Sequence, residues 1–258
     1  GGLHYGHMGA DSAGFVLVKG SSRNRFSRNT ARMGGDGFFI AGLSPEGAHL
    51  GCDDNVFEEN DASLSPNIAF ECTFSRGNRF VRNFAERSNY GFWLGWSSET
   101  VVEDNRIVMN RQAGIAAENA LSLTIVGNTF QANGHGVLAW SQVVPSFEDQ
   151  FPTHHTSRDW EISGNTFTRN GKGIRIAADQ DHGIRTSERA GGPSSRPTGF
   201  VIRKNDIQDN RIGIELAGAD KTFIQENILN RNAEANLRQD DCVAEVFRNN
   251  LGAAGAYL

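Results

Sequence analysis

The residues of this chain best suited to chemistry are two glutamates and two tryptophans in similar surroundings. Glu71 lies in NIAFECTFS and Glu118 in AGIAAEN, while Trp93 and Trp140 lie in YGFWLGWS and HGVLAWS. Each segment alternates side chains with period two, which is typical of a β-strand whose neighbouring residues point to opposite faces. Two carboxyl groups held near each other can act as the acid and the base that cleave a glycosidic bond.

These segments belong to a repeat that runs through almost the whole chain. A hexamer, N-x-[F/I/L]-x-x-N, occurs eight times, and a short alternating segment follows each copy. The closest copies are 22 residues apart, which suits one circuit of three short strands and their turns. Asparagine tolerates the left-handed backbone of sharp corners, and its side-chain amides can stack in a hydrogen-bonded ladder. The repeat therefore predicts that residues 1–258 form one domain, a parallel β-helix in which each circuit is a rung. The copies begin at Asn24, Asn55, Asn78, Asn105, Asn128, Asn165, Asn205 and Asn227.

The composition agrees with many short strands. The chain has 30 Gly, 17 Phe and only 6 Pro, with 38% hydrophobic residues, a mixture that suits strands separated by tight turns. The net charge of −5 offers no basic field for a nucleic acid, and the chain has no apolar run of about 18 residues that could span a membrane. Cys52, Cys72 and Cys242 lie far apart, so they predict neither a metal site nor a disulfide framework.

Alignment of the strands on their glycines sorts the side chains into columns. The column directly after the aligned residue is apolar throughout, so we expect it to face the core, as does the column that contains Cys72. The columns between these two are expected to face solvent. The first outward column is Phe39, Glu71, Trp93, Ala116, Leu138, Arg175 and Glu215, and the second is Ala41, Thr73, Gly95, Glu118, Trp140, Ala177 and Ala217.

The outward columns predict an exposed aromatic surface. Trp93 and Trp140, with Phe39 beside them and Trp96 just past the strand end, would lie on neighbouring rungs about 5 Å apart. Sugar rings stack on surfaces of this kind, so a polysaccharide or oligosaccharide is the expected partner. The alternative is that loops cover these rings, which would then form a second apolar cluster.

Irregular spacing in the repeat predicts two further features. Insertions at about 141–160 and 178–200 would stand beside the aromatic surface as walls. The gap from hexamer to aligned glycine is eight or nine residues in the first three copies and three or four afterwards. We therefore expect the solenoid to be wider near its N-terminus, with a step between Gly91 and Gly114. Together the walls and the step predict a concave site around Glu71, Trp93, Glu118, Trp140 and Arg175.

The asparagine hexamers and the alternating strands resemble the pectate-lyase-like superfamily of right-handed β-helix proteins, and within it the generic bacterial right-handed β-helix repeat proteins. The resemblance covers almost the whole chain. It implies an all-β fold, a right-handed single-stranded parallel β-helix of about nine to ten rungs. It also implies a carbohydrate-active protein that is extracellular or periplasmic.

The paired glutamates favour a glycoside hydrolase. Strand spacing places the Cα atoms of Glu71 and Glu118 roughly 12 Å apart. Side chains that lean together would bring the carboxyls toward the separation of about 6.5 to 9.5 Å that inverting enzymes use. Trp93 lies between them, and by excluding water it would raise the pKa of one carboxyl, as a general acid requires. The alternative is that both glutamates are solvated surface residues.

Two other classes of function stay open. A lyase or C5-epimerase that acts on a uronate needs a cationic group and a base. The epimerases of the resembled superfamily carry an Asp-Pro-His-Asp string, which this chain lacks. The third class is non-catalytic: a glycan-binding protein such as an adhesin or a tailspike shaft, or a periplasmic accessory protein. The residues that could supply the lyase or epimerase roles are Arg175, His135, His154, His155, Lys172 and His182.

No cofactor and no metal site are predicted. His154 and His155 stand beside Asp159, but adjacent side chains do not readily converge on one ion. The outward columns hold no cluster of aspartates, which weakens a calcium-dependent lyase and leaves calcium as a minor alternative. Gly1 falls where a rung would begin, so we expect another segment, domain or subunit to cover the N-terminal end.

Overall fold

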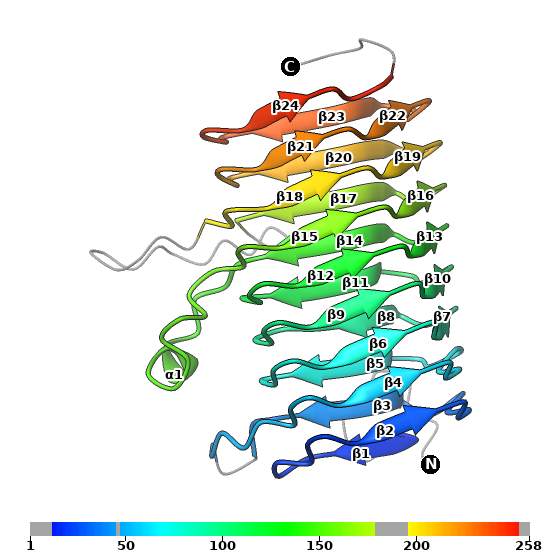
Figure 1. Ribbon diagram of the computed structural model, residues 1–258, viewed down its shortest axis with the longest axis vertical. Coiled ribbons are helices and arrows are strands. Elements are labelled where there is room, and N and C mark those ends of the chain that lie inside the picture. Colours follow the sequence, from blue (N-terminus) through cyan, green and yellow to red (C-terminus); the bar gives the residue numbers. More distant parts are fainter. Residues whose placement is uncertain (1–11, 45–46, 179–195, 253–258) are drawn as a thin grey trace.

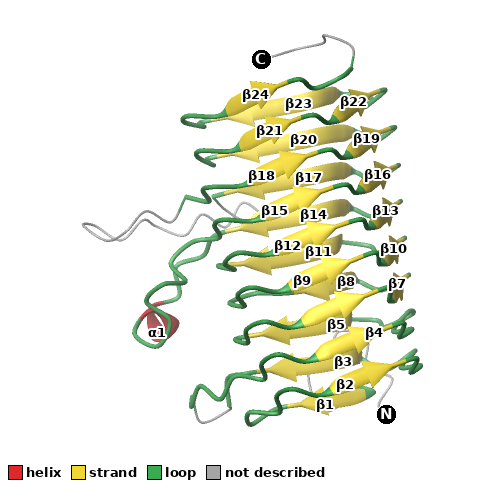
Figure 2. Ribbon diagram, in the orientation of Figure 1, coloured by secondary structure: helices red, strands yellow, loops and turns green. Residues whose placement is uncertain are grey.

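The alternating segments form the longest strands of the protein, and these strands stack in parallel. The computed structural model describes residues 12–44, 47–178 and 196–252. In this part of the chain, 24 strands form three parallel sheets, named sheets A, B and C, which every full rung visits in that order (Figures 1 and 2). Sheets A and B have nine strands each. The prediction of an all-β parallel helix with about nine to ten rungs is confirmed.

The strand bounds show how regular the rungs are. Sheet A consists of β1 (Phe15–Leu17), β3 (Asp36–Ala41), β5 (Ile68–Thr73), β8 (Tyr90–Trp93), β11 (Ala113–Glu118), β14 (His135–Trp140), β17 (Lys172–Ala177), β20 (Ile212–Ala217) and β23 (Ala235–Asp240). Sheet B consists of β2 (Arg25–Ser27), β4 (Val56–Glu58), β6 (Arg79–Val81), β9 (Val101–Glu103), β12 (Thr124–Val126), β15 (Glu161–Ser163), β18 (Val201–Arg203), β21 (Phe223–Gln225) and β24 (Val246–Arg248). Sheet C is shorter and consists of β7 (Phe84–Glu86), β10 (Arg106–Val108), β13 (Thr129–Gln131), β16 (Thr166–Thr168), β19 (Asp206–Gln208) and β22 (Ile228–Asn230).

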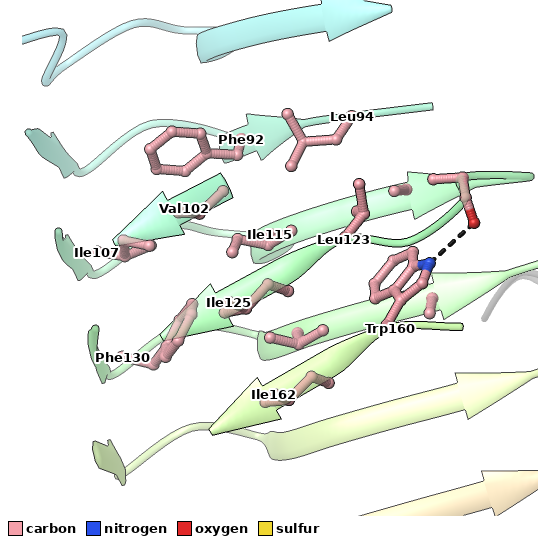
Figure 3. Packing of buried hydrophobic residues seen from close by; sticks show 14 of the residues in the cluster. Phe92, Leu94, Val102, Ile107, Ile115, Leu123, Ile125, Phe130, Trp160 and Ile162 are labelled. Atoms are coloured by element: carbon pink, nitrogen blue, oxygen red, sulfur yellow. Dashed lines mark hydrogen bonds between the residues drawn. The ribbon is translucent and has the colours of Figure 1, made fainter. Parts of the chain in front are cut away.

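Columns of like side chains fill the interior. Phe38, Phe70 and Phe92 follow one another up sheet A with ring centroids 5.1 and 4.9 Å apart, and all three are fully buried. Farther along the solenoid the same column becomes aliphatic, and Trp160 donates an indole hydrogen bond of 2.8 Å to the Ala120 carbonyl (Figure 3). The predicted inward columns are thus confirmed, including Cys72 as a core residue. Like residues stack well because neighbouring strands are only about 4.8 Å apart.

Asparagine ladders hold the corners of the rungs. At the corner between sheets B and C, each buried asparagine donates its Nδ2 to the Oδ1 of the asparagine in the next rung, over 2.9 to 3.0 Å. The same Oδ1 also accepts the backbone N–H of the preceding rung, as in Asn105 and Asn128. The structural role expected for the asparagines is therefore confirmed. This ladder contains Asn29, Asn60, Asn83, Asn105, Asn128, Asn165, Asn205, Asn227 and Asn250.

The eight hexamers occupy two different places in the rung. The change in spacing between hexamer and glycine therefore does not indicate a change in the width of the solenoid. The first three copies span sheet B, whereas the copies from Asn105 onward span sheet C and end in a second ladder at the corner between sheets C and A. Measured from the ladder between sheets B and C, Asn83 precedes Gly91 by the same number of residues as Asn128 precedes Gly136. The expected step between Gly91 and Gly114 is therefore absent, and the register does not support a wider N-terminal end.

One long connection leaves the solenoid between β14 and β15 and carries the short helix α1 (Pro145–Glu148), which lies beside lower-numbered rungs (Figure 1). Most of the second predicted insertion, together with His182, lies outside the described residues, as does the N-terminal end that we expect to be covered. Within the described ranges, no helix is long and apolar enough to cross a membrane.

Removal of one ladder amide should destabilise the whole solenoid. The Asn128 side chain donates to Val102 and Val126 carbonyls and to Asn165, and it accepts two bonds from Asn105. Asn128→Ala leaves these buried groups unpaired, so we expect the free energy of unfolding to fall by about 3 kcal/mol or more. Urea denaturation followed by circular dichroism measures this change. Asn230→Ala, on the outer side of β22, is the control and should change it by less than about 1 kcal/mol.

Candidate active site on sheet A

The outer face of sheet A carries three columns of side chains instead of the two predicted. The additional column stands directly before the corner glycines and contains Asp36, Tyr90, His135 and Lys172. Strand register places Glu71 beside Trp93 and Trp93 beside Ala116, while Glu118 stands beside Trp140. Glu71 and Glu118 are therefore on the same face, two rungs apart, on either side of the rung that holds Trp93.

The Glu118 carboxyl lies over the backbone of Gly95. A β-carbon placed at Gly95 would meet Oε1 of Glu118 at 2.5 Å, its Cδ at 2.6 Å and its Oε2 at 2.8 Å. Because real β-carbons do not approach other atoms so closely, only glycine leaves room for the carboxyl here. Oε2 of Glu118 is enclosed and has no hydrogen-bond partner among the described residues. Gly95 thus directs Glu118 down toward the rung of Trp93.

Both carboxyls have pKa values well above the ordinary value for glutamate. Burial, followed by the negative charges of Asp36 and Glu118, raises the pKa of Glu71 to about 8. Burial likewise raises the pKa of Glu118 to about 8, although hydrogen bonds from its own backbone N–H and from the Trp93 side chain lower it in part. Asp36 is fully buried and accepts hydrogen bonds from Asn67 Nδ2 and the Ile68 N–H, at 2.8 and 3.0 Å. Two proton-binding carboxyls therefore stand on one outer face.

The aromatic surface is largely covered, contrary to expectation. Trp140 is only 2% exposed and packs edge-on against the half-buried Trp93, with ring centroids 5.4 Å apart. Ala116 and Leu138 are buried in the same outer cluster, and Tyr90 packs against Trp93 at 4.9 Å. Period two gives the direction of a side chain, but adjacent large apolar groups on a face bury one another to reduce their contact with water. The second apolar cluster named as the alternative is therefore present, and Glu71, Phe39 and Trp93 remain half-buried at its edge.

Trp96 belongs to a different cluster, under the long connection that carries α1. It is 3% exposed, with its ring 5.2 Å from Phe147 and 6.1 Å from Phe151. Phe151 also meets His49, at 4.7 Å, so the connection contacts the loop that follows β3. The expectation that Trp96 forms part of an exposed sugar-binding surface is wrong, because its ring anchors residues 141–160 to the solenoid.

Asn119, the residue after Glu118, holds both ends of this connection. Its Nδ2 donates to the Gln142 and His154 carbonyls, each at 2.7 Å, and its Oδ1 accepts the Gln142 N–H at 2.6 Å. Its backbone φ of 49° is one that asparagine tolerates well. The connection is thus fixed beside the strand that carries Glu118 and forms a wall along that edge of sheet A.

Arg175 and His135 lie on the same face but farther along the solenoid. Arg175 Nε lies 3.3 Å and Lys172 Nζ 2.7 Å from Oε2 of Glu215, in a cluster whose side chains are only 10 to 12% exposed. His135 Nδ1 donates to the Gln112 carbonyl over 3.1 Å, and His135 neighbours Lys172 in the register. The structure therefore brings Glu71, Trp93, Glu118 and Trp140 together, and it places His135 one rung and Lys172 and Arg175 two rungs beyond Glu118.

His154 and His155 stand apart from the acid pair, on the connection. Burial lowers the pKa of His154 to about 4, and its ring stacks on Trp96 at 6.4 Å. His155 Nδ1 faces the Pro152 carbonyl at 3.5 Å. Among the residues that the structure describes, no three histidine, cysteine, aspartate or glutamate side chains are grouped so that they could hold a metal ion.

Tyr90 and Asp36 were missed because the alignment began each strand at its glycine. The residue before that glycine also points outward, since the chain bends at the corner and the glycine drops out of the pairing register. The signal was present in the sequence as the polar residues of DGFF, YGFW, HGVL and KGIR. These additions give the acid pair a charged neighbour, Asp36, and a hydroxyl-bearing neighbour, Tyr90.

Comparison with known proteins bears on the fold. The family model described as right handed beta helix region matches residues 11–149 and 153–255. No curated protein matches the chain. The chain is similar in structure to the Dettilon tailspike protein (TM-score 0.58, 16% identity, 92% of this chain and 54% of that chain). It is also similar to a mannuronan C-5 epimerase A-module of Azotobacter vinelandii (0.51, 14%, 95% and 55%) and to the surface adhesin PfbA of Streptococcus pneumoniae (0.51, 13%, 90% and 71%). The chain thus spans about half the length of the tailspike and epimerase chains.

The raised pKa values predict a fall in stability with rising pH. Glu71 and Glu118 bind a proton more tightly in the folded protein than in the unfolded chain, so the free energy of unfolding should fall from about pH 4.5 to about pH 8. Glu71→Gln and Glu118→Gln should each reduce this fall by on the order of 1 to 2 kcal/mol, allowing for solvent screening at half-buried groups. Urea denaturation at about pH 5 and pH 8 measures it. Glu103→Gln, on β9, should keep the wild-type fall, and an unchanged fall in both site variants would contradict the assignment.

The anchoring role of Asn119 predicts a release of the connection without unfolding of the solenoid. Asn119→Gly keeps the positive φ accessible but deletes the three side-chain hydrogen bonds. We expect chymotrypsin to cleave at Phe147 or Phe151 roughly ten-fold faster than in the wild type, because local opening becomes easier. Limited proteolysis followed by mass spectrometry locates the cuts. Asn89→Gly is the control, because within the described part of the chain the Asn89 side chain bonds only Arg111. Equal cleavage rates in all three proteins would exclude the role.

Proposed function

Because the chain belongs to the right-handed β-helix family, whose model matches nearly all of it, we propose that it uses the outer face of sheet A to cleave a polysaccharide by glycoside hydrolysis. One observation carries the proposal. Two carboxyls with pKa values raised to about 8 lie on one face, two rungs apart, with the half-buried ring of Trp93 between them. Such a pair with unequal surroundings is the arrangement that acid–base cleavage of a glycosidic bond requires.

The surroundings assign the two roles. Glu71 faces the negative charges of Asp36 and Glu118, which favour its protonated form, so Glu71 is the general acid that protonates the glycosidic oxygen. Glu118 receives hydrogen bonds from its backbone and from Trp93 that favour its ionised form, so Glu118 is the general base. It removes a proton from the water that attacks the anomeric carbon, while the leaving sugar departs with the proton of Glu71. A separation of two rungs leaves room for this water, which favours inversion.

The remaining features support substrate binding along the same face. Trp93 offers the partly exposed ring on which a sugar can stack, and the connection fixed by Asn119 flanks the base. Phe39 stands beside Glu71 on the neighbouring rung and adds a second half-buried aromatic ring to this face. A polysaccharide does not cross a cell membrane unaided, so we propose that the protein is extracellular or periplasmic.

A second candidate is a lyase or C5-epimerase acting on a uronate. It is favoured by the cationic cluster of Lys172, Arg175 and Arg238 around Glu215, on the same face as the acid pair. Cationic groups can neutralise the carboxylate of a uronate and so acidify the C5 proton. The A-module of the mannuronan C-5 epimerase has a similar fold. The surface adhesin PfbA is also similar in fold, and non-catalytic glycan binding is the third candidate for this chain.

Conservative replacement of each carboxyl tests the assignment. Glu71→Gln and Glu118→Gln should each lower kcat by about 100-fold or more, since a general acid or base supplies about 10² to 10⁴ of the rate. The wild type should show a bell-shaped pH dependence with its maximum near pH 8, where one carboxyl is ionised and the other still protonated. The assay follows new reducing ends and the absorbance of unsaturated products over a panel of neutral and uronate polysaccharides.

Glu103→Gln is the matched control and should retain full activity, because Glu103 pairs with Arg79 on sheet B. New reducing ends without unsaturation identify a hydrolase, and unsaturated products identify a lyase instead. Turnover that persists in both glutamine variants would refute the acid–base roles, and binding without turnover in the wild type would support the non-catalytic candidate.

A further inference from the structure

A hollow lies on a different side of the solenoid from the two glutamates, where sheet C begins. Sheet C starts at β7, and in the preceding rung Asp61 forms isolated bridges to Thr30 and Phe84, not a strand, before the chain turns away at Leu64. The missing strand leaves a hollow of about 300 Å³. This volume is at the lower end of the range for small-molecule sites and suits one or two sugar residues. Its lining includes Arg32, Asp61, Leu64, Phe84, Glu86 and Arg87.

The walls of the hollow are fixed by hydrogen bonds. Asp61 Oδ1 accepts the Ser63 N–H at 3.0 Å, and Ser63 Oγ accepts the Glu86 N–H at 3.2 Å. The Leu64 N–H donates to the Glu86 carbonyl at 2.8 Å. These bonds tie the turn to β7, so the site is formed before any ligand arrives and little ordering is needed on binding.

The lining chemistry suits a neutral, hydroxyl-rich ring. Phe84 is 44% exposed, an unusual exposure for an aromatic residue inside a hollow, and it offers a flat apolar face. The lining contributes two acidic and two basic side chains, so hydrogen-bond acceptors and donors are both present and the formal charges of the lining balance; Glu86 is also paired with Arg106 of β10. Arg32 lies 3.5 Å from Asp61, whereas the guanidinium of Arg87 makes no ion pair within the described residues. A phosphate would need a net positive lining, and an apolar ligand would need an enclosed apolar one.

We propose that this hollow is a second saccharide-binding site, which holds one or two neutral sugar residues with one ring stacked on Phe84. It lies at the edge of sheet C, whereas Glu71 and Glu118 lie on sheet A. The existence of this binding site does not depend on the proposed cleavage on sheet A. A polysaccharide that engages it stays attached between encounters with sheet A, so the effective concentration of chain at the acid pair rises.

Affinity electrophoresis tests the site in the Glu71→Gln/Glu118→Gln background, in which the gel polymer is not degraded. The probes are dextran, xylan, glucomannan and mixed-linkage β-glucan, with alginate and polygalacturonate as acidic polymers. Phe84→Ala should weaken retardation by at least one neutral polymer by about three- to ten-fold, which corresponds to the loss of one aromatic contact. Arg87→Asn, which tolerates the positive φ of this position, should weaken it in the same direction.

Phe223→Ala is the matched control, because Phe223 is 42% exposed on β21 of sheet B and does not line the hollow. It should leave retardation unchanged, and thermal denaturation should show that all variants are folded. The proposal is overturned if neither Phe84→Ala nor Arg87→Asn changes retardation, if Phe223→Ala weakens it equally, or if no neutral polymer retards the parent protein. Cleavage of short oligosaccharides by Phe84→Ala, with both glutamates intact, reports separately on sheet A.

Discussion

The amide ladder at the corner between sheets B and C imposes the constraint on which the rest of the protein depends. Each buried asparagine donates to one neighbour and accepts from the other, so every rung must bring its asparagine to the same angle around the axis. A rung out of phase would leave a buried amide and a backbone N–H unpaired, at about 1 to 3 kcal/mol for each group. Once the phase is fixed, strand pairing aligns every column of sheet A without further specification.

The chemistry of sheet A follows from that alignment. Glu71 and Glu118 are 47 positions apart in sequence, yet the common phase brings them to one face with Trp93 between them. The glycine at 95 then gives the Glu118 carboxyl a place over the backbone, and Asp36 adds a negative charge beside Glu71. The same surroundings that bury the two carboxyls also raise their pKa values, so burial and proton affinity have one cause.

The sequence was informative where the signal is local and periodic. The repeat predicted a parallel β-helix, and period two correctly assigned Phe38, Phe70 and Cys72 to the core. It failed where exposure depends on contacts distant in the chain: Trp140 is covered by its outer cluster, and Trp96 by a connection that begins 45 residues later. The hexamer was also ambiguous, because the same spacing between corner asparagines occurs along sheet B and along sheet C. Only the hydrogen-bonding partners distinguish the two.

All the long described excursions of the chain leave the solenoid at the corner between sheets A and B, and the excursion after β14 is tied at its neck by Asn119. Its two ends meet at nearly one point, so the strand pairing of the solenoid does not depend on the length of the connection. Residues 143–153 can therefore be exchanged for another sequence, provided that apolar side chains still cover Trp96 as Phe147 and Phe151 do. Recombination or engineering could replace them to alter which polymer is admitted, while the proton-transfer groups on the strands keep their positions.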